Sequence, residues 1–287
     1  MRKTTRKLWL LALLLLLLGS CGLPAQETPP AGEPGQAETE APGTEAEPEP
    51  EPESEPEPEP EPEPEAEPVF APAVPAGEPV DPAWFQDAAF VGDSVSVMLD
   101  MYNSSSGHLG SPAFFCSVSL SQSNALSYPA GHERLPEYPK GSGQRPRLLD
   151  GIAASSANKI YVMLGMNCIS EGVDRSCQNL VVLVDAILEV RPEAAILIQS
   201  VTPMTAESPR TDELLNNQTI CAYNQQMQAI CQERGWYYLN VAEALSDENG
   251  YLRDDYSGDK AMGIHLNYKG AEAWADYLLT HVPEALK

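Results

Sequence analysis

The sequence predicts an α/β fold in which a parallel sheet is covered by helices on both faces. Five short apolar segments of strand length recur along residues 81–287. Segments with apolar residues at helical spacing separate them, and this alternation is typical of parallel sheets. The first apolar segment is continuous rather than alternating, as expected for a strand that is buried on both faces.

The first predicted strand leads directly into a possible functional residue. Ala88–Val91 is apolar, Gly92 interrupts the run, and Asp93 and Ser94 follow just before a predicted helix at 95–102. Ser94 therefore lies at the carboxyl end of a strand, where open α/β sheets bind their ligands. Its position allows two interpretations, a nucleophile or a simple helix cap.

The remaining elements follow in order. Four more strands are predicted within Pro112–Ser119, Asn158–Met166, Ala194–Val201 and Trp236–Val241. Three long helices are predicted at Val173–Val190, Asp212–Arg234 and Tyr268–Thr280. Residues 127–146 are rich in proline, glycine and charge, and predict a long surface loop. In the last helix, Trp274 and Leu278 are expected to pack on the sheet.

The N-terminal residues have the pattern of an export signal. Basic residues precede Leu8–Leu18, an apolar run that is too short to span a bilayer, for which about 20 residues are needed. Leu18–Cys21 resembles a bacterial lipobox, which implies cleavage before Cys21 and a lipid on its sulfur. Residues 1–20 are therefore interpreted as a lipoprotein signal peptide, and the protein as anchored outside the cytoplasm to a membrane.

Residues 21–80 are predicted to form a disordered spacer that starts at the lipidated Cys21. Glu47–Pro64 is almost pure Glu-Pro, in which proline lacks a hydrogen-bond donor and the glutamates repel one another. The part from Glu27 onward, extended at about 3.1 Å per residue, reaches at most ~170 Å. The globular domain is expected over residues 81–287.

Charge and cysteine content narrow the classes of partner. Residues 81–287 carry 25 acidic and 13 basic side chains, a net charge of −12 without a basic stripe, so no nucleic-acid partner is expected. A neutral or cationic substrate suits this charge better than a polyanion. The cysteines and histidines lack the spacing of a zinc site, and no metal or cofactor is expected. A disulfide between Cys168 and Cys177 is left open.

Three motifs follow one another along the predicted domain: Phe90–Ser94, the Gly-x-Asn of Gly165–Asn167, and the Gly-Ile-His-Leu-Asn of Gly263–Asn267. In this order they resemble the motifs of the SGNH hydrolases, also called GDSL-type esterases. The resemblance covers residues 83–287. It implies a flavodoxin-like three-layer α/β/α fold with a central five-stranded parallel sheet, and ester hydrolysis as the activity.

The resemblance also assigns roles to residues. Ser94 matches the nucleophile and His265 the base that takes its proton. Asn167 matches a side-chain donor to the oxyanion, and Ser119 occupies the position of a backbone N–H donor that is usually a glycine. The N–H of Ser94 is the third expected donor.

One departure from the family concerns the residue that orients the histidine. The family usually has an aspartate three residues before it, where this chain has Met262. A buried ring N–H still needs an acceptor. A backbone carbonyl of residues 258–262 would give a Ser–His dyad, whereas Asp259 would give an atypical triad. The carbonyl is the favoured acceptor, because local geometry does not fix the direction of a side chain six residues away.

The resulting hypothesis is a lipid-anchored, extracytoplasmic serine esterase that removes small acyl groups, such as O-acetyl, from carbohydrate. Two alternatives remain open on the sequence. The same residues could transfer an acyl group to a cell-wall sugar, or the domain could be an inactive carbohydrate-binding lipoprotein.

Overall fold

The computed structural model describes residues 73–208 and 214–287. The predicted signal peptide, Cys21 and the spacer as far as residue 72 lie outside these residues. Within them, five strands form one parallel sheet in the order β2-β1-β3-β4-β5. The strands are β1 Ala88–Gly92, β2 Ala113–Cys116, β3 Lys159–Met163, β4 Ala195–Gln199 and β5 Tyr237–Leu239. The predicted fold class is confirmed.

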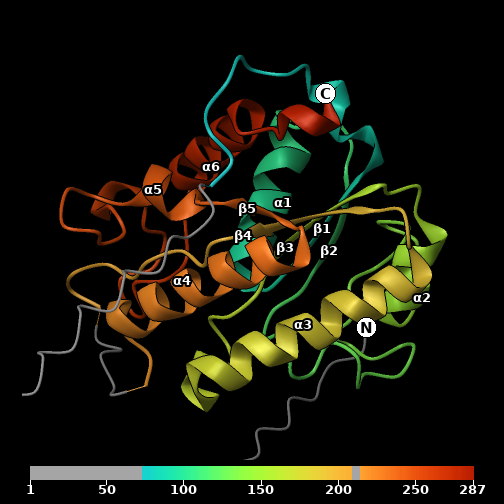
Figure 1. Cartoon of the computed structure of the whole chain (residues 1–287), viewed down its shortest axis with the longest axis horizontal. Coiled ribbons are helices and arrows are strands. Elements are labelled where there is room, and N and C mark those ends of the chain that lie inside the picture. Colours follow the sequence, from blue (N-terminus) through green and yellow to red (C-terminus); the bar gives the residue numbers. More distant parts are fainter. Residues whose placement is uncertain (1–72, 209–213) are drawn as a thin grey trace, which may run out of the picture. The chain divides into compact units, whose positions relative to one another are not determined.

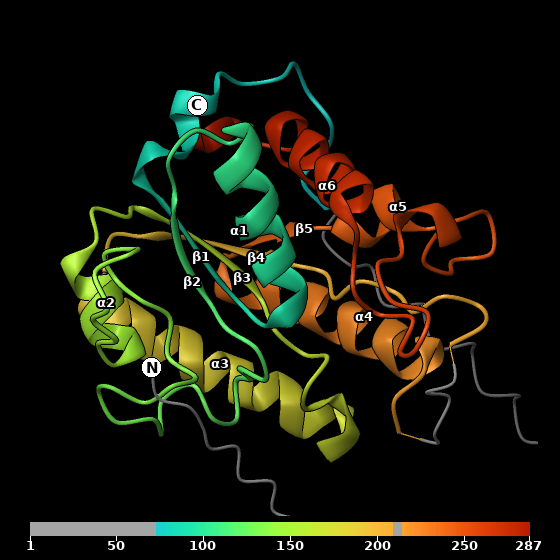
Figure 2. The ribbon, with the colours of Figure 1, turned by 180° about the vertical axis from the view of Figure 1, so that it is seen from behind.

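Helices cover both faces of this sheet (Figures 1 and 2). One face packs against α1 Ser94–Ser106, α5 Val241–Leu245 and α6 Tyr268–Thr280. The other packs against α2 Leu148–Ala154, α3 Val173–Val190 and α4 Asn217–Arg234. Short 3₁₀ helices occur at Pro82–Asp87, Ile169–Glu171, Asp254–Tyr256 and Glu284–Leu286. The result is a three-layer α/β/α arrangement.

The α6 helix is fixed to the middle of the sheet as its apolar spacing predicts. Trp274 and Leu278 are both fully buried, in the same cluster as Phe90 of β1. The indole Nε1 of Trp274 donates to the side-chain oxygen of Gln199 at 2.8 Å, so its one polar group is satisfied inside the core. This anchoring holds the start of α6, and the loop before it, near the carboxyl ends of the strands.

Several boundaries differ from the sequence prediction for local reasons. The α4 helix begins at Asn217 rather than at residue 212, because Asn216 accepts from the N–H of Thr219 while the Thr219 hydroxyl accepts from the N–H of Asn216. The short helices α2 and α5 were not predicted. The loop 127–146 contains no helix or strand, as expected.

Residues 73–80, which composition assigns to the spacer, pack on the domain. The N–H of Val74 donates to the carbonyl of Tyr238 in β5 at 2.9 Å, and Val80 donates to Leu279 at 2.9 Å. Val74 is buried against the α1–α5–α6 side of the core. The folded part therefore includes this segment, which lies upstream of the predicted boundary at residue 81 and which we call the N-terminal strap.

The cysteines in the described part of the chain are all free thiols. Cys168 and Cys177 are both buried but form no bridge, which settles the disulfide that the sequence left open. None of the helices in residues 73–208 and 214–287 has the length and apolar character needed to cross a bilayer.

Candidate active site

Ser94 is positioned by the sharp turn between β1 and α1. Gly92 ends the strand in a place where a side chain does not fit, since an added Cβ would lie 2.0 Å from the Ser96 hydroxyl. Asp93 is the N-cap of α1, and its carboxylate accepts from the N–H of Val95 at 2.9 Å. Ser94 is thus the first residue of the helix and is half-buried at the carboxyl end of β1.

His265 comes from the loop before α6 and meets Ser94 across 171 positions of sequence. Its ring Nε2 lies 2.9 Å from the Ser94 hydroxyl oxygen, which is hydrogen-bond distance. About a quarter of the His265 side chain is exposed. The base role that the resemblance implies for His265 requires such a contact, and the structure has it.

The acceptor for the second ring nitrogen of His265 is the carboxylate of Asp259. His265 Nδ1 and Asp259 Oδ2 are in hydrogen-bond contact. The favoured expectation of a backbone carbonyl is therefore wrong, and the alternative arrangement with Asp259 is the one observed. The reason is a tight turn between Asp259 and His265, which are six positions apart, and this turn brings the carboxylate to the ring.

That turn is closed by the same carboxylate. The other oxygen of Asp259 accepts from the N–H groups of Met262 at 2.9 Å and Gly263 at 2.7 Å. Gly263 has φ +69°, and an added Cβ would lie 2.3 Å from the Thr205 hydroxyl, so both backbone and packing require glycine. Met262 thus contributes its backbone, rather than its side chain, to the orientation of His265.

The surroundings of Asp259 favour its ionised form. Partial burial acts to raise the pKa of its carboxyl, but the hydrogen bonds from His265, Met262 and Gly263 outweigh it and hold the pKa below the ordinary value. An ionised Asp259 keeps the proton of the neutral His265 ring on Nδ1, which leaves the lone pair of Nε2 facing Ser94. His265 is thereby in the correct tautomer to accept the Ser94 proton.

Ser119 lies in the loop after β2 with an unusual backbone. Its φ is +61°, in the left-handed region that favours glycine. Its carbonyl accepts from the side chain of Asn124 at 3.0 Å, and the loop begins with a hydrogen bond from Ser117 N–H to Gly92 O. The serine therefore keeps a glycine-like geometry beside the turn that carries Ser94.

Asn167 follows β3 and is exposed at its end. Its side-chain Nδ2 donates to the carbonyl of Leu120 at 3.0 Å, the residue after Ser119. This bond draws the loops after β2 and β3 together and uses one of the two amide protons. The structure thus places Asn167 against the Ser119 loop, with no direct hydrogen bond to Ser94.

Asp93 is a buried titratable group beside the site that the sequence indicated only as a cap. Burial raises the pKa of its carboxyl to about 6, while the Val95 N–H and the nearby His265 act to lower it. The sequence pointed to this buried group only by its position directly before Ser94, in the turn between β1 and α1.

Within the described residues, no group of three or more His, Cys, Asp or Glu side chains could hold a metal ion.

Comparison with known proteins identifies the family. The model of the GDSL-like lipase/acylhydrolase family matches residues 116–273, more than half of the chain. The chain belongs to this family. The matched stretch of this GDSL-like acylhydrolase contains Asn167, Asp259 and His265 but begins after Ser94, so Ser94 is assigned from its own motif and its contact with His265.

One solved structure supports the same fold, and two others are similar to the chain at lower TM-scores. A Streptococcus pneumonia protein, described as a candidate platelet activating factor, is 20% identical, with a TM-score of 0.52 over 67% of this chain and 81% of that one. A GDSL-like lipase from Bacteroides thetaiotaomicron is 15% identical, with a TM-score of 0.47 over 70% and 89%. A carbohydrate esterase of family 3 from Talaromyces cellulolyticus is 14% identical, with a TM-score of 0.45 over 67% and 93%. No curated protein matches the chain.

Proposed function

We propose that this GDSL-like acylhydrolase is a serine esterase that works through a Ser94–His265–Asp259 triad. The observation that carries the proposal is the unbroken chain of contacts from the Ser94 hydroxyl through both nitrogens of His265 to the Asp259 carboxylate. A serine hydroxyl is a weak nucleophile until a base takes its proton. Here the base is His265, whose ring contacts the Ser94 hydroxyl. When His265 takes the proton and becomes charged, the carboxylate of Asp259 stabilises that charge.

The reaction divides into two acyl transfers. His265 takes the Ser94 proton while the oxygen attacks the ester carbonyl, and then returns this proton to the departing alcohol, which leaves an acyl-serine. Water enters next and gives a proton to His265. The resulting hydroxide displaces Ser94, which recovers the proton and releases the carboxylic acid. Asp259 stays ionised throughout.

The negative charge on the tetrahedral intermediate needs donors that are already in place. The N–H of Ser94 lies at the start of α1, where helix N–H groups have no helical partner. Ser119 N–H and the remaining amide proton of Asn167 complete the proposed oxyanion hole. Each such donor contributes roughly 3–4 kcal/mol to the stabilisation of the transition state.

The proposed substrates are small acyl esters, with O-acetyl groups on carbohydrate as the favoured class. The support is the inferred location, because the lipobox-like Leu18–Cys21 and the Glu-Pro spacer would hold the domain outside the cytoplasm at a membrane. O-acetyl groups of polysaccharides would be within reach of a domain held there, and the net negative charge of the domain favours neutral substrates over polyanions.

The test is covalent labelling of Ser94. The full chain is treated with a fluorophosphonate, which reacts only with an activated serine, and hydrolysis of nitrophenyl acetate is measured alongside. Ser94→Ala should abolish both signals. Ser106→Ala, at the other end of the same helix, is the matched control and should leave them intact. A folded wild-type chain that neither labels nor hydrolyses would instead indicate a binding protein.

A further inference from the structure

An open hollow of about 480 Å³ borders the loop after β2 that carries Ser119. Its lining includes Val97, Val118, Ser119, Glu133, Arg134 and Arg145, and we call it the Arg134 hollow. Its volume falls in the range of about 300–1,000 Å³ that is usual for small-molecule sites. Ser119 belongs both to this hollow and to the proposed oxyanion hole.

The hollow also follows the first turn of α1. Val97 lies three residues after Ser94, and residues at this spacing share one face of a helix. On the opposite wall, Ser117 donates to Gly92 O at 3.1 Å, so the loop after β2 runs directly beside the turn that carries the nucleophile. A group that extends from an ester bound at Ser94 therefore has a space to enter.

The charged side chains of the hollow differ in whether they already have a partner within the protein. Arg145 is occupied, since its guanidinium donates to the carbonyl of Leu135 and pairs with Glu137 at 3.3 Å. In the described residues, no ion pair involves Glu133 or Arg134, and both are exposed. Within the described part of the chain, the guanidinium of Arg134 makes one side-chain hydrogen bond, a long one of 3.4 Å to the Tyr128 hydroxyl. A carboxylate acceptor and a guanidinium donor thus both line the hollow, and neither has an ion-pair partner in the described residues.

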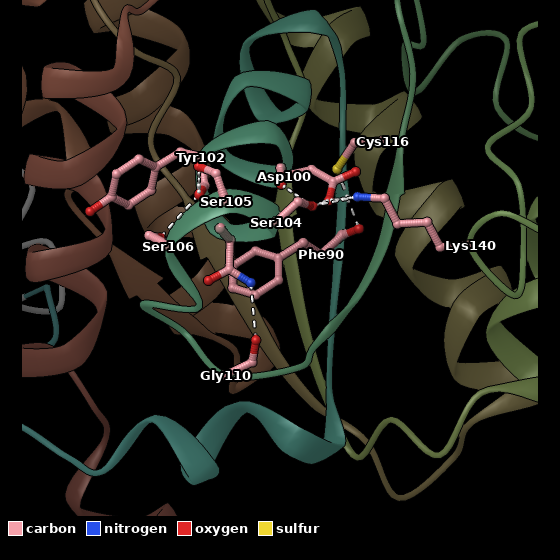
Figure 3. Close-up of polar contacts among 10 residues, drawn as sticks. Phe90, Asp100, Tyr102, Ser104, Ser105, Ser106, Gly110, Cys116 and Lys140 are labelled. Carbon is pink, nitrogen blue, oxygen red and sulfur yellow. Dashed lines mark hydrogen bonds and ion pairs between the residues drawn. The ribbon is translucent and has the colours of Figure 1, made fainter.

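The loop that carries these two residues is held in place. Lys140, further along the loop, lies 2.5 Å from the Asp100 carboxylate and 2.6 Å from the Ser104 hydroxyl, both on α1 (Figure 3). Gly131 N–H donates to the Arg145 carbonyl at 2.7 Å and closes the loop on itself. A preformed loop lowers the entropy cost of binding a ligand.

We propose that the Arg134 hollow is the subsite for the alcohol part of the ester, and that this part is a neutral, hydroxyl-rich sugar ring. Glu133 accepts from ring hydroxyls, Arg134 donates to them, and Val97 and Val118 contact the C–H faces. An anionic alcohol would meet the unpaired Glu133 carboxylate, and a purely apolar one would remove water from two charges without replacing its hydrogen bonds. The inference rests on the proposed esterase function and adds the place where the sugar alcohol of its substrate binds.

The experiment compares two esters of the same acid in the full chain. One is a mono-O-acetylated hexose, whose alcohol fills the hollow, and the other is nitrophenyl acetate, whose alcohol bears no hydroxyls. The measured quantity is the ratio of kcat/KM for the first ester to that for the second. Glu133→Gln and Arg134→Ala should each lower this ratio on the order of tenfold, mainly through KM for the sugar ester.

Matched controls use a glutamate and an arginine outside the hollow. Glu189→Gln on α3 and Arg234→Ala at the end of α4 should leave the ratio unchanged. An unchanged ratio in Glu133→Gln and Arg134→Ala would overturn the inference. A higher kcat/KM of the wild type for an O-acetylated uronate than for the neutral hexose would overturn it too, because Arg134 would then recognise an anion.

A binding arm separates this inference from the proposed function. In the Ser94→Ala background, calorimetry measures binding of the acetylated hexose with and without Glu133→Gln. Weaker binding with Glu133→Gln supports the subsite even if the wild type hydrolyses nothing, in which case only the esterase proposal fails. If Ser94→Ala and the Ser94→Ala, Glu133→Gln double variant bind the acetylated hexose equally well, the subsite is contradicted even if the esterase is active.

Discussion

At the scale of single residues, the role of Asp259 can be measured directly. Asp259→Asn removes the charge that faces His265 and favours the wrong ring tautomer, so kcat for nitrophenyl acetate should fall about 10³- to 10⁴-fold. Circular dichroism should show a folded protein. Asp254→Asn, on an exposed carboxylate in the same stretch of chain, is the matched control. A loss below tenfold would restore the dyad interpretation.

The backbone of Ser119 predicts a variant that is more stable than the wild type and retains its activity. A left-handed φ costs an L-residue roughly 1–2 kcal/mol, which glycine avoids, although glycine loses about 0.5–1 kcal/mol of backbone entropy. Ser119→Gly should therefore raise the free energy of unfolding by up to about 1 kcal/mol in urea titrations. Its kcat should stay within about twofold, because the N–H is the proposed donor. A large loss of kcat would assign a role to the hydroxyl instead.

Asp93 gives the domain a stability that depends on pH. Because burial raises the pKa of its carboxyl to about 6, above the ordinary 3.8, the folded protein holds this proton more tightly than the unfolded chain. The contribution is fully present below about pH 4 and is lost as the pH rises through about 6. It is on the order of 3 kcal/mol.

The contribution of Asp93 is measured as a difference between two proteins, in which the effects of all other titrating groups cancel. The free energies of unfolding of the wild type and of Asp93→Asn are determined in urea between about pH 4 and pH 7.5. Asparagine still caps α1, so the variant should fold. The difference, wild type minus variant, should fall as the pH rises and level off above about pH 7. A difference that is constant with pH would show that Asp93 does not titrate in this range.

At the scale of secondary-structure elements, the sequence predicted what local patterns determine. The bounds of α3 and α6 agree with the prediction because strong apolar periodicity coincides with clear ends, such as Pro192 after α3 and the Asn267 cap before α6. The helices α2 and α5 have seven and five residues, too few for a periodic signal. Ser94, Asn167 and His265 were found because each lies next to a strand end or helix start.

The acceptor for His265 could not be predicted in the same way. The direction of Asp259 depends on a turn closed by Met262 and Gly263, and Gly263 in turn packs against Thr205 and Ser208 from a distant loop. Such a contact is tertiary, and no local pattern encodes it. The N-terminal strap was missed for a similar reason, since its composition resembles that of the spacer before it.

The N-terminal strap should stabilise the domain. Its backbone hydrogen bonds to Tyr238, Thr280 and Leu279, together with burial of Val74, are lost when the chain starts at residue 81 instead of residue 73. Net contributions of about 1 kcal/mol per hydrogen bond and about 2 kcal/mol for valine set an upper bound of about 5 kcal/mol on the loss, which the entropy of ordering the strap reduces. Urea unfolding of the two chains measures it.

A second variant separates the two contributions of the strap. Val74→Ala in the chain that starts at residue 73 removes apolar burial but keeps the backbone bonds, and should account for about 1–2 kcal/mol. Ala76→Gly, at an exposed position of the same segment, is the control. If the chains starting at 73 and 81 unfold at the same urea concentration, the strap contributes nothing to stability.

At the scale of the whole molecule, two parts of the chain have separate tasks. The described residues contain the complete set of groups in the proposed mechanism, from Ser94 to His265. We propose that the residues upstream of the strap only set the location of the enzyme, because the sequence from residue 22 onward has the Glu-Pro-rich composition of a spacer. This separation predicts that location and catalysis can be changed independently.

Two changes test that independence. Cys21→Ala removes the proposed lipid attachment site and should move the protein from the membrane fraction to the soluble fraction, measured by fractionation and immunoblotting. Deletion of residues 27–67 keeps Cys21 and the strap, and should leave the protein in the membrane fraction. In both variants the thermal midpoint and kcat for nitrophenyl acetate should equal those of the wild type. A Cys21→Ala variant that stays in the membrane fraction would exclude the lipid anchor, and a lower thermal midpoint after the deletion would show that the spacer contributes to the fold.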